Sequence, residues 1–295
     1  MGSHVDCIAC IVNKANNLAD LYIKDKRKKY GFMQAVLTEI LHTGYDRSAP
    51  LVEAKMTRIA RQVTGIEDFY EHDKRYFNDL LLSLEQDVET LICKGEEPLV
   101  EALKAALAGN IIDFSALNNV PPDLVKDIIF KTVTEQELDS CTYERLLDDL
   151  ACSTNLLYLG DNAGEIVLDK ILLKYIKRRF PHLNIVFTTR GTPISSDVTE
   201  KDAYYVGIDQ YAAIVNNGTD LPGTDLQEVS DVFKDAFEAA EVIIAKGQGN
   251  FETLTDSGKN IYYLFLCKCN VFVKKLNSGR FTPIFQAERK SQKGR

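Results

Sequence analysis

The chain has 295 residues and a mass of 33.1 kDa, enough for one large domain or two modest ones. Hydrophobic residues make up 45% of it and charged residues 26%, which is typical of a globular protein and excludes wholesale disorder. The formal net charge is −8 and the pI is near 5.2. This acidic balance argues against a nucleic-acid-binding protein, because such proteins carry basic surfaces that neutralise phosphates.

The sequence also argues against a membrane or secreted protein. No apolar run approaches the roughly 20 residues that a transmembrane helix needs, and the N-terminus lacks the basic start and apolar core of a secretory signal. Seven cysteines are an odd number in a chain too large to need disulfides for stability. We therefore expect a cytoplasmic protein with neither membrane nor nucleic-acid partners.

The first half of the chain, residues 1–150, carries patterns typical of helices. It holds 26 acidic and 17 basic side chains, whereas the rest holds 17 and 18, so composition and periodicity change at the same place. Residues 5–150 are therefore predicted to form a helical N-terminal domain. The predicted helices cover residues 8–23, 31–41, 52–63, 77–92 and 99–108, the last with Gly109-Asn110 as its C-cap, and a further helix opens at 121–123.

After about residue 150, short apolar runs alternate with helical patterns. Runs that are apolar on both faces are typical of parallel strands covered by helices. This alternation predicts an α/β domain over residues 151–285, followed by a frayed polar tail at 286–295. The predicted strands are 156–159, 185–188, 213–215, 242–245 and 261–266, and the predicted helices are 166–179 and 230–240.

Four of the predicted strands end in an unusual polar loop. Because ligands of open parallel α/β sheets bind at the carboxyl ends of the strands, these loops are expected to converge. In the first loop, residues 160–165, Asp161 and Asn162 offer two hard oxygen ligands suited to Mg²⁺ or Mn²⁺. The alternative is an Asx turn in which one of these side chains caps the following helix.

The second loop, residues 190–200, offers a further carboxylate. Asp197 would bind the same metal, and Arg190 at the strand end would hold phosphate. The alternative is structural, since Asp197 followed three residues later by Glu200 resembles a capping box.

The third and fourth loops carry weaker signals. Asn217-Gly218 is a common turn signal, although its amides and backbone N–H groups would also suit a sugar or phosphate. Lys246 closes an apolar strand, and a buried lysine is costly unless it is paired. The glycines after Lys246 would let the backbone approach a ligand closely.

Two cysteine pairs need a separate interpretation. Cys7 and Cys10 form a C-x-x-C pair, and Cys267 and Cys269 follow a predicted strand. Four thiols would suit zinc, but these spacings match no known finger. Packed cysteines are therefore favoured over a zinc or redox role.

Together the four loops resemble the damage-control phosphatase family, with its ARMT-like metal-binding domain. The likeness rests on the order, spacing and strand-end placement of residues 160–165, 190–203, 217–224 and 246–252. The early C-x-x-C pair is similar to that of the archaeal and bacterial subfamily, so the resemblance covers nearly the whole chain. It implies a three-layer α/β/α sandwich with a largely parallel sheet, preceded by an all-helical N-terminal domain.

The resemblance also implies a divalent-metal phosphatase acting on phosphorylated metabolites. The family's metal ligands correspond to Asp161, Asn162 and Asp197, and its strand-end lysine corresponds to Lys246. Lys268 falls in the family's Lys-Cys segment.

The sequence therefore predicts a phosphomonoesterase that hydrolyses sugar phosphates or damaged phosphorylated metabolites. Mg²⁺, Mn²⁺, Co²⁺ or Ni²⁺ would polarise a phosphate oxygen and activate water. Lys246 is expected to reach the same cavity as the metal from the opposite wall. The predicted catalytic residues are Asp161, Glu165, which would orient the water, and Lys246, and the predicted phosphate ligands are Arg190, Asn217, Gly218, Lys246 and Lys268.

Other classes of protein stay open at this point. One is a non-catalytic metabolite- or nucleotide-binding protein that uses the same sheet edge, and another is a zinc-stabilised interaction protein built on the cysteines. A haloacid-dehalogenase-type phosphatase would need Asp-x-Asp after its first strand, where this chain has Asp161-Asn162. Ser195-Ser196 stands where many relatives have Ile-Asn or similar residues, so no substrate is carried over, and the oligomeric state is open as well.

Overall fold

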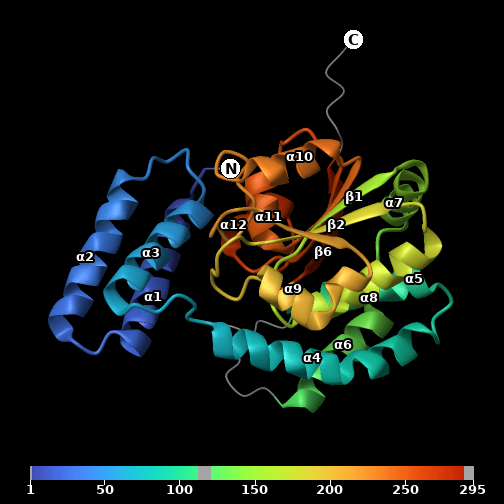
Figure 1. Ribbon diagram of the computed structural model, residues 1–295, viewed down its shortest axis with the longest axis horizontal. Helices are drawn as coiled ribbons and strands as arrows, with labels where there is room; N and C mark the ends of the chain where they lie inside the picture. Colours follow the sequence, from blue (N-terminus) through green and yellow to red (C-terminus); the bar gives the residue numbers. More distant parts are fainter. Residues whose placement is uncertain (1, 112–120, 289–295) are drawn as a thin grey trace, which may run out of the picture.

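The computed structural model describes residues 2–111 and 121–288. Within these ranges a six-stranded sheet has helices on both faces, and α1, α2 and α3 stand to one side of it (Figure 1). None of the helices in this part of the chain is both long and apolar enough to cross a membrane. The strands are β1 (Asn155–Leu159), β2 (Asn184–Thr189), β3 (Ala213–Asn216), β4 (Val242–Lys246), β5 (Ile261–Leu266) and β6 (Pro283–Glu288). The helices are α1 (Val5–Tyr22), α2 (Lys26–His42), α3 (Ala49–Thr64), α4 (Glu71–Ile92), α5 (Pro98–Ile111), α6 (Pro122–Glu135), α7 (Ser140–Cys152), α8 (Glu165–Arg179), α9 (Glu200–Val206), α10 (Asp231–Ala239), α11 (Gly247–Leu254) and α12 (Asn270–Leu276).

The sheet is parallel except at one edge. Its strand order is β3-β2-β1-β4-β5-β6, and only β6 runs antiparallel to its neighbour among the described strands. Strand β1 pairs with β2 on one side and with β4 on the other, so the strand order reverses at β1. Ligands of open α/β sheets bind outside the carboxyl ends of the strands at such a reversal. The loops after β1, β2 and β4 are therefore the ones positioned to build a site.

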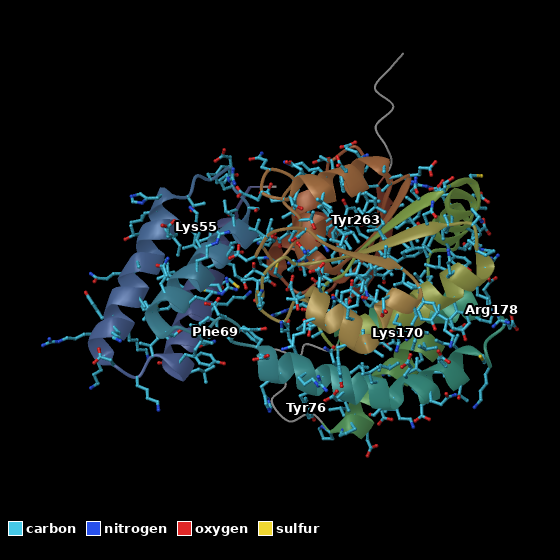
Figure 2. All side chains as sticks on the ribbon, viewed as in Figure 1. Lys55, Phe69, Tyr76, Lys170, Arg178 and Tyr263 are labelled. Atoms are coloured by element: carbon cyan, nitrogen blue, oxygen red, sulfur yellow. The ribbon has the colours of Figure 1, made fainter. Side chains whose placement is uncertain are left out.

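Alternating side chains of the strands enter two hydrophobic cores, one on each face of the sheet. Tyr158 belongs to the core shared with α4 to α8, and its neighbour Leu157 belongs to the core shared with α10, α11 and α12. On the first face, an ion pair joins α8 to α4: Lys170, labelled in Figure 2, lies 2.7 Å from Glu85. These layers confirm the predicted three-layer α/β/α sandwich with a largely parallel sheet.

The N-terminal three-helix unit, formed by α1, α2 and α3, has a core of its own. Ala15, Phe32 and Ala60 are buried in it, and the ring of Phe69 lies 4.9 Å from that of Tyr22 at its edge (Figure 2). Helices α4 to α7 instead share the core of the sheet. The predicted boundary at residue 150 thus does not separate two cores, because the apolar faces of α4 and α5 are buried against α8.

Three local predictions are corrected by the structure. Helix α5 continues through Gly109-Asn110 to residue 111, and a Cβ on Gly109 would lie 3.2 Å from the Cα of Glu165, so this glycine allows α5 and α8 to pack closely. The predicted loop after Lys246 is helix α11, which begins at Gly247. Residues 286–288 belong to β6 rather than to a frayed tail, and residues 289–295 lie outside the described residues.

Candidate functional site

The loops after β1 and β2 lie side by side because their strands are parallel neighbours. Two backbone hydrogen bonds of 2.9 Å join residues 161–163 to residues 196–198, and Asn162 pairs with Asp197 as an antiparallel bridge between them. The predicted metal ligands Asp161, Asn162 and Asp197 are thereby brought together, and all three line one cavity.

Neither loop uses these side chains to cap a helix. Gly164 is the N-cap of α8, and its amide donates to Asn78 Oδ1 at 2.6 Å rather than to Asp161 or Asn162. The capping box of α9 is formed by Thr199 and Asp202, since the amide of Thr199 donates to Asp202 Oδ2 at 2.9 Å. The capping alternative for Asp197 and Glu200 is therefore wrong, as is the one for the first loop.

The side-chain amide of Asn162 is oriented by the acids around it. Its Nδ2 donates to Asp161 Oδ2 at 2.6 Å and to Glu165 Oε2 at 3.1 Å. Because only the nitrogen of an amide can donate to carboxylates, Oδ1 points the other way. There it accepts a hydrogen bond from Ser196 Oγ at 2.7 Å and keeps a second lone pair for another partner.

Arg190 lies behind the acids rather than in the cavity. Its side chain is 1% exposed, its Nε donates to Asp197 Oδ2 at 2.7 Å, and its Nη2 lies 3.9 Å from Asp161 Oδ1. Nη1 donates to Asn250 Oδ1 at 3.5 Å, whereas the buried Nη2 has no hydrogen-bond partner among the described residues. Arg190 thus offsets the charge of two acids and keeps one donor free.

Burial and the charges of neighbouring acids disfavour the ionised form of both Asp161 and Asp197. Burial, the charge of Asp197 and that of Glu165 raise the pKa of Asp161 to about 8. Burial also raises the pKa of Asp197, against the opposing charge and hydrogen bond of Arg190. A cation near the two carboxylates would favour their ionised form. Asp161 Oδ1 and Asp197 Oδ1 accept no hydrogen bond from the described residues, so these atoms are available to it.

Lys246 and Glu165 are wholly buried behind the site. Lys246 Nζ lies 2.7 Å from Glu165 Oε1 and 2.5 Å from Asp169 Oδ1, and it donates to the carbonyl of Ala106 at 2.8 Å. These partners use all three donors of the ammonium group. Burial alone would lower the pKa of Lys246, but the two acids raise it above its ordinary value. Neither side chain lines the cavity, which corrects the expectation that Lys246 reaches it.

Of the other predicted phosphate ligands, Lys268 lines the cavity and Asn217 and Gly218 do not. The positive charge of Lys268 opposes the rise in the pKa of Asp161, so the two side chains lie within electrostatic reach. Asn217 is fully buried, and its Oδ1 accepts the amide of Gly191 at 3.2 Å. Gly218 has a φ of 79°, as its turn requires. Asn217 and Gly218 therefore build the loop.

The cavity in front of the site has a volume of about 980 Å³ and is lined by two parts of the chain. The α/β part contributes the three predicted metal ligands together with Lys268 and Arg280. The three-helix unit contributes Lys14 of α1 and Glu53 of α3. The sequence did not reveal these last residues, because charged side chains on an amphipathic helix ordinarily face solvent.

Asn110 of α5 is a further site residue that the sequence did not reveal. It is 1% exposed, and its Nδ2 donates to Asp161 Oδ2 at 3.1 Å and to the two oxygens of Glu165 at 3.2 and 3.0 Å. Its Oδ1 accepts the amide of Leu266 at 2.8 Å, so it joins the ends of β1 and β5. The available signal was a Gly-Asn pair within strong helix formers, which also fits a close helix contact.

Cysteines from opposite ends of the sequence line the same cavity. Cys7, Cys10 and Cys269 contribute to its wall, and all are free thiols. Burial raises the pKa of Cys7, so this thiol is not activated as a thiolate. In the described ranges no three His, Cys, Asp or Glu side chains are grouped closely enough to hold a metal ion. The cysteines therefore form no preassembled zinc site there.

The donor set of Asp161, Asn162 and Asp197 fits a hard divalent cation. Two carboxylates and an amide oxygen are ligands that Mg²⁺ and Mn²⁺ accept, and such ions complete their coordination with water and substrate oxygens. The raised pKa values of both acids and their two free oxygens are what such a site would show before a cation binds.

The fold and this site define an α/β protein with an oxygen-donor centre at the carboxyl ends of its strands. Within this class, the sequence-family model of the damage-control phosphatase ARMT1-like domain matches residues 3–282 of the chain. The chain therefore belongs to the damage-control phosphatase ARMT1-like family, as its four loops suggested.

Individual relatives are similar over most of their length. A damage-control phosphatase of Archaeoglobus fulgidus is 31% identical over 269 residues, which cover 89% of this chain and 91% of that one. A damage-control phosphatase of Pyrococcus horikoshii is 28% identical over 277 residues, which cover 92% of this chain and 93% of that one. An uncharacterized protein of Methanocaldococcus jannaschii is 30% identical over 274 residues, which cover 90% of this chain and 88% of that one. The crystal structure of a DUF89 family protein from Pyrococcus horikoshii matches the fold with a TM-score of 0.88 at 24% identity, covering 99% of this chain and 100% of that one. The family and its named members support a phosphatase-type enzyme.

Proposed function

We propose that this protein is a metal-dependent phosphatase that hydrolyses phosphate monoesters of small metabolites, such as sugar phosphates or damaged phosphorylated metabolites. The observation that carries the proposal is the convergence of Asp161, Asn162 and Asp197 on one cavity. The named damage-control phosphatases among its relatives support the reaction class. Seven free cysteines fit a reducing, cytoplasmic location.

In this proposal the three oxygen donors hold one divalent ion, which is Mg²⁺, Mn²⁺, Co²⁺ or Ni²⁺. Such an ion, when bound, supplies a Lewis acid for a phosphate oxygen and lowers the pKa of a coordinated water. The protein's own part is to hold the donors in place. Asn110 fixes the Asp161 carboxylate, and Glu165 fixes the Asn162 amide. Because Glu165 is wholly buried, its proposed role is to orient a metal ligand rather than water.

Positive side chains would offset the charge of the phosphate. Lys268 and Arg280 line the cavity, whereas Arg190 would act from behind the acids by offsetting the charge of Asp161 and Asp197. Lys246 would act on the site only through Glu165, because its ammonium group holds the Glu165 carboxylate in place and neutralises its charge.

The test is hydrolysis of a chromogenic phosphate ester and a panel of sugar and cofactor phosphates, after metal removal and with each divalent ion added back. We expect turnover only with a divalent ion, and its loss in Asp161→Ala. The matched control is Asp231→Ala, whose side chain is 97% exposed and does not line the cavity. Full activity in chelator, or near-normal turnover of Asp161→Ala at limiting metal, would contradict the proposal. Tight binding of a phosphate ester without turnover would support the non-catalytic alternative.

A further inference from the structure

Helix α3 of the three-helix unit contacts the loop that carries Asp197. Ser195 Oγ donates to Glu53 Oε1 at 2.8 Å, and the guanidinium group of Arg61 donates to the carbonyl of Pro193. Both contacts fall on the loop just before Asp197. A helix that supplies no metal ligand is thus attached to a loop that does.

Glu53 is itself held from its other side. It is 9% exposed, and Lys14 Nζ of α1 donates to its two carboxylate oxygens at 2.8 and 2.7 Å. Burial alone would raise the pKa of Glu53, but the charge and hydrogen bond of Lys14 and the hydrogen bond of Ser195 lower it below its ordinary value. The acceptor of the Ser195 hydroxyl is therefore an ionised carboxylate, which makes a stronger hydrogen bond than a neutral group.

The backbone at Ser195 is in a conformation that needs support from its surroundings. Its φ is 45°, in the left-handed region that residues other than glycine rarely adopt. The next residue, Ser196, donates through Oγ to Asn162 Oδ1 at 2.7 Å, and the amide of Asp197 donates to the carbonyl of Ile194 at 3.0 Å. The turn at Ser195 therefore sets the direction of the two residues that follow it into the site.

We propose that Glu53 and Ser195 are positioning residues whose hydrogen bond holds residues 193–198 in the conformation that presents Asp197 to the metal. This inference rests on the proposed metal site. It gives the three-helix unit a part in metal binding, although that unit contributes no ligand.

The first experiment measures Mn²⁺ binding to the full chain by titration calorimetry, for Ser195→Ala, Glu53→Ala and the double variant. Each single variant is expected to bind Mn²⁺ about tenfold more weakly, the effect of one lost charge-assisted hydrogen bond. The double variant is expected to bind no more weakly than Glu53→Ala, because the two residues act through one contact. The Mn²⁺ concentration for half-maximal hydrolysis should rise by the same factor, while kcat at saturating Mn²⁺ stays within about twofold.

The second experiment needs neither metal nor activity. Amide hydrogen exchange of residues 194–198 in the metal-free chain is expected to be about tenfold faster in both single variants than in the unmodified protein. If the unmodified protein neither binds Mn²⁺ nor hydrolyses phosphate esters, the proposed function fails, while hydrogen exchange still decides whether Glu53 and Ser195 hold the loop.

Two further variants distinguish this contact from backbone strain at Ser195 and from general docking of the three-helix unit. Arg47→Ala removes hydrogen bonds of 2.9 Å to Gln227 and 2.8 Å to Glu228, which also join the three-helix unit to the α/β part but not at residues 193–198. It should leave exchange and Mn²⁺ affinity unchanged. Ser195→Gly suits the positive φ and lacks the hydroxyl, so it should behave like Ser195→Ala, and it remains informative if the alanine variant does not fold.

The inference is overturned by any of three results. The first is Mn²⁺ affinity within about twofold of normal, together with normal exchange, in Ser195→Ala. The second is normal behaviour of Ser195→Gly beside a weakened Ser195→Ala, which would assign the effect to backbone strain. The third is equal loosening of the loop in Arg47→Ala, which would assign the effect to general docking of the three-helix unit.

Discussion

Replacing Asp161 with asparagine should stabilise the metal-free protein, although it removes a ligand of the proposed metal site. Burial and the charges of Asp197 and Glu165 raise the pKa of Asp161 to about 8 in the folded chain, against about 3.9 in an unfolded one. The folded state therefore binds this proton more tightly than the unfolded state does. The stability that Asp161 contributes is present below about pH 4 and is lost as the pH rises through about 8.

The size of the effect follows from this difference in pKa. About four pKa units correspond to an upper limit of about 5 kcal/mol in the free energy of unfolding above pH 8. The side chain is 13% exposed and lines the cavity, so solvent screening reduces this figure. Altered hydrogen bonding of the asparagine costs about 1 kcal/mol. We therefore expect a net gain of about 2 kcal/mol near pH 8, or about 4 °C in melting temperature, and a net loss of about 1 kcal/mol near pH 4, where only the hydrogen-bond cost remains.

The assay is a series of thermal melts between pH 4 and pH 9 in chelator, repeated with Mn²⁺. The unmodified protein should gain stability from Mn²⁺ and Asp161→Asn should not, because only a bound ligand shifts the folding equilibrium. Asp220→Asn is the control, since that buried acid is paired with Arg58 and Arg61 and its loss should destabilise the chain. A lower melting temperature of Asp161→Asn near pH 8 in chelator, or a difference that does not vary with pH, would refute the reasoning.

Three further substitutions test how the site is supported. Gly247→Ala would place Cβ 2.1 Å from Asp161 Cγ, so we expect metal-dependent kcat/KM to fall by about 100-fold. The control is Gly258→Ala, which has a similar φ of 76° and nothing within 4 Å, and which should cost only about 1 kcal/mol in urea unfolding. Equal activity losses in the two variants would disprove the steric explanation. Lys246→Met leaves two buried acids without their cation and should lower the free energy of unfolding by about 3–5 kcal/mol, so an unchanged urea midpoint would contradict its role. Lys268→Met should leave stability within about 0.5 kcal/mol and raise KM for a phosphate ester about tenfold, and an unchanged KM would remove Lys268 from phosphate binding.

The sheet and the close approach of its loops could be predicted from the sequence, because each follows from a local pattern. The run Leu156–Leu159 is apolar on both faces, as a strand covered by helices must be, and it lies within β1. Once β1 and β2 are parallel neighbours, Asp161 and Asp197 have to approach each other at one edge. Local spacing and one topological rule were therefore sufficient for this part of the site.

The position of Lys246 could be predicted only in part from the sequence. Its place at the end of an apolar strand indicated that an ammonium group there would need a partner if it were buried, and the structure shows it buried against Glu165 and Asp169. Its partners Glu165 and Asp169 lie four residues apart on one face of α8, but the predicted helix began at residue 166 and left Glu165 in the preceding loop. Assigning the lysine to phosphate overlooked that these acids would reach it first.

The contributions of the other helices could not be predicted, because they depend on how distant segments dock. Nothing near Glu53 in the sequence indicates that α3 lies against the Asp197 loop, and a charged residue on an amphipathic helix is ordinarily solvated. Asn110 was interpreted as a helix end, since Gly-Asn is a common C-cap, whereas α5 continues and directs the amide at Asp161.

The charges around the site account for the need for these supports. The connected acids are Asp161, Asp197, Glu165 and Asp169, and the bases bound to them are Arg190 and Lys246. Four acids against two bases leave an excess of two negative charges in a region that is largely closed to solvent. Burial and neighbouring acids raise the pKa of Asp161 to about 8, and burial raises the pKa of Asp169 to about 6. Protons therefore reduce the excess negative charge when no cation is bound. A divalent ion at the cavity side of this network would supply the missing charge, so the buried pairs and the proposed metal site are parts of one electrostatic arrangement.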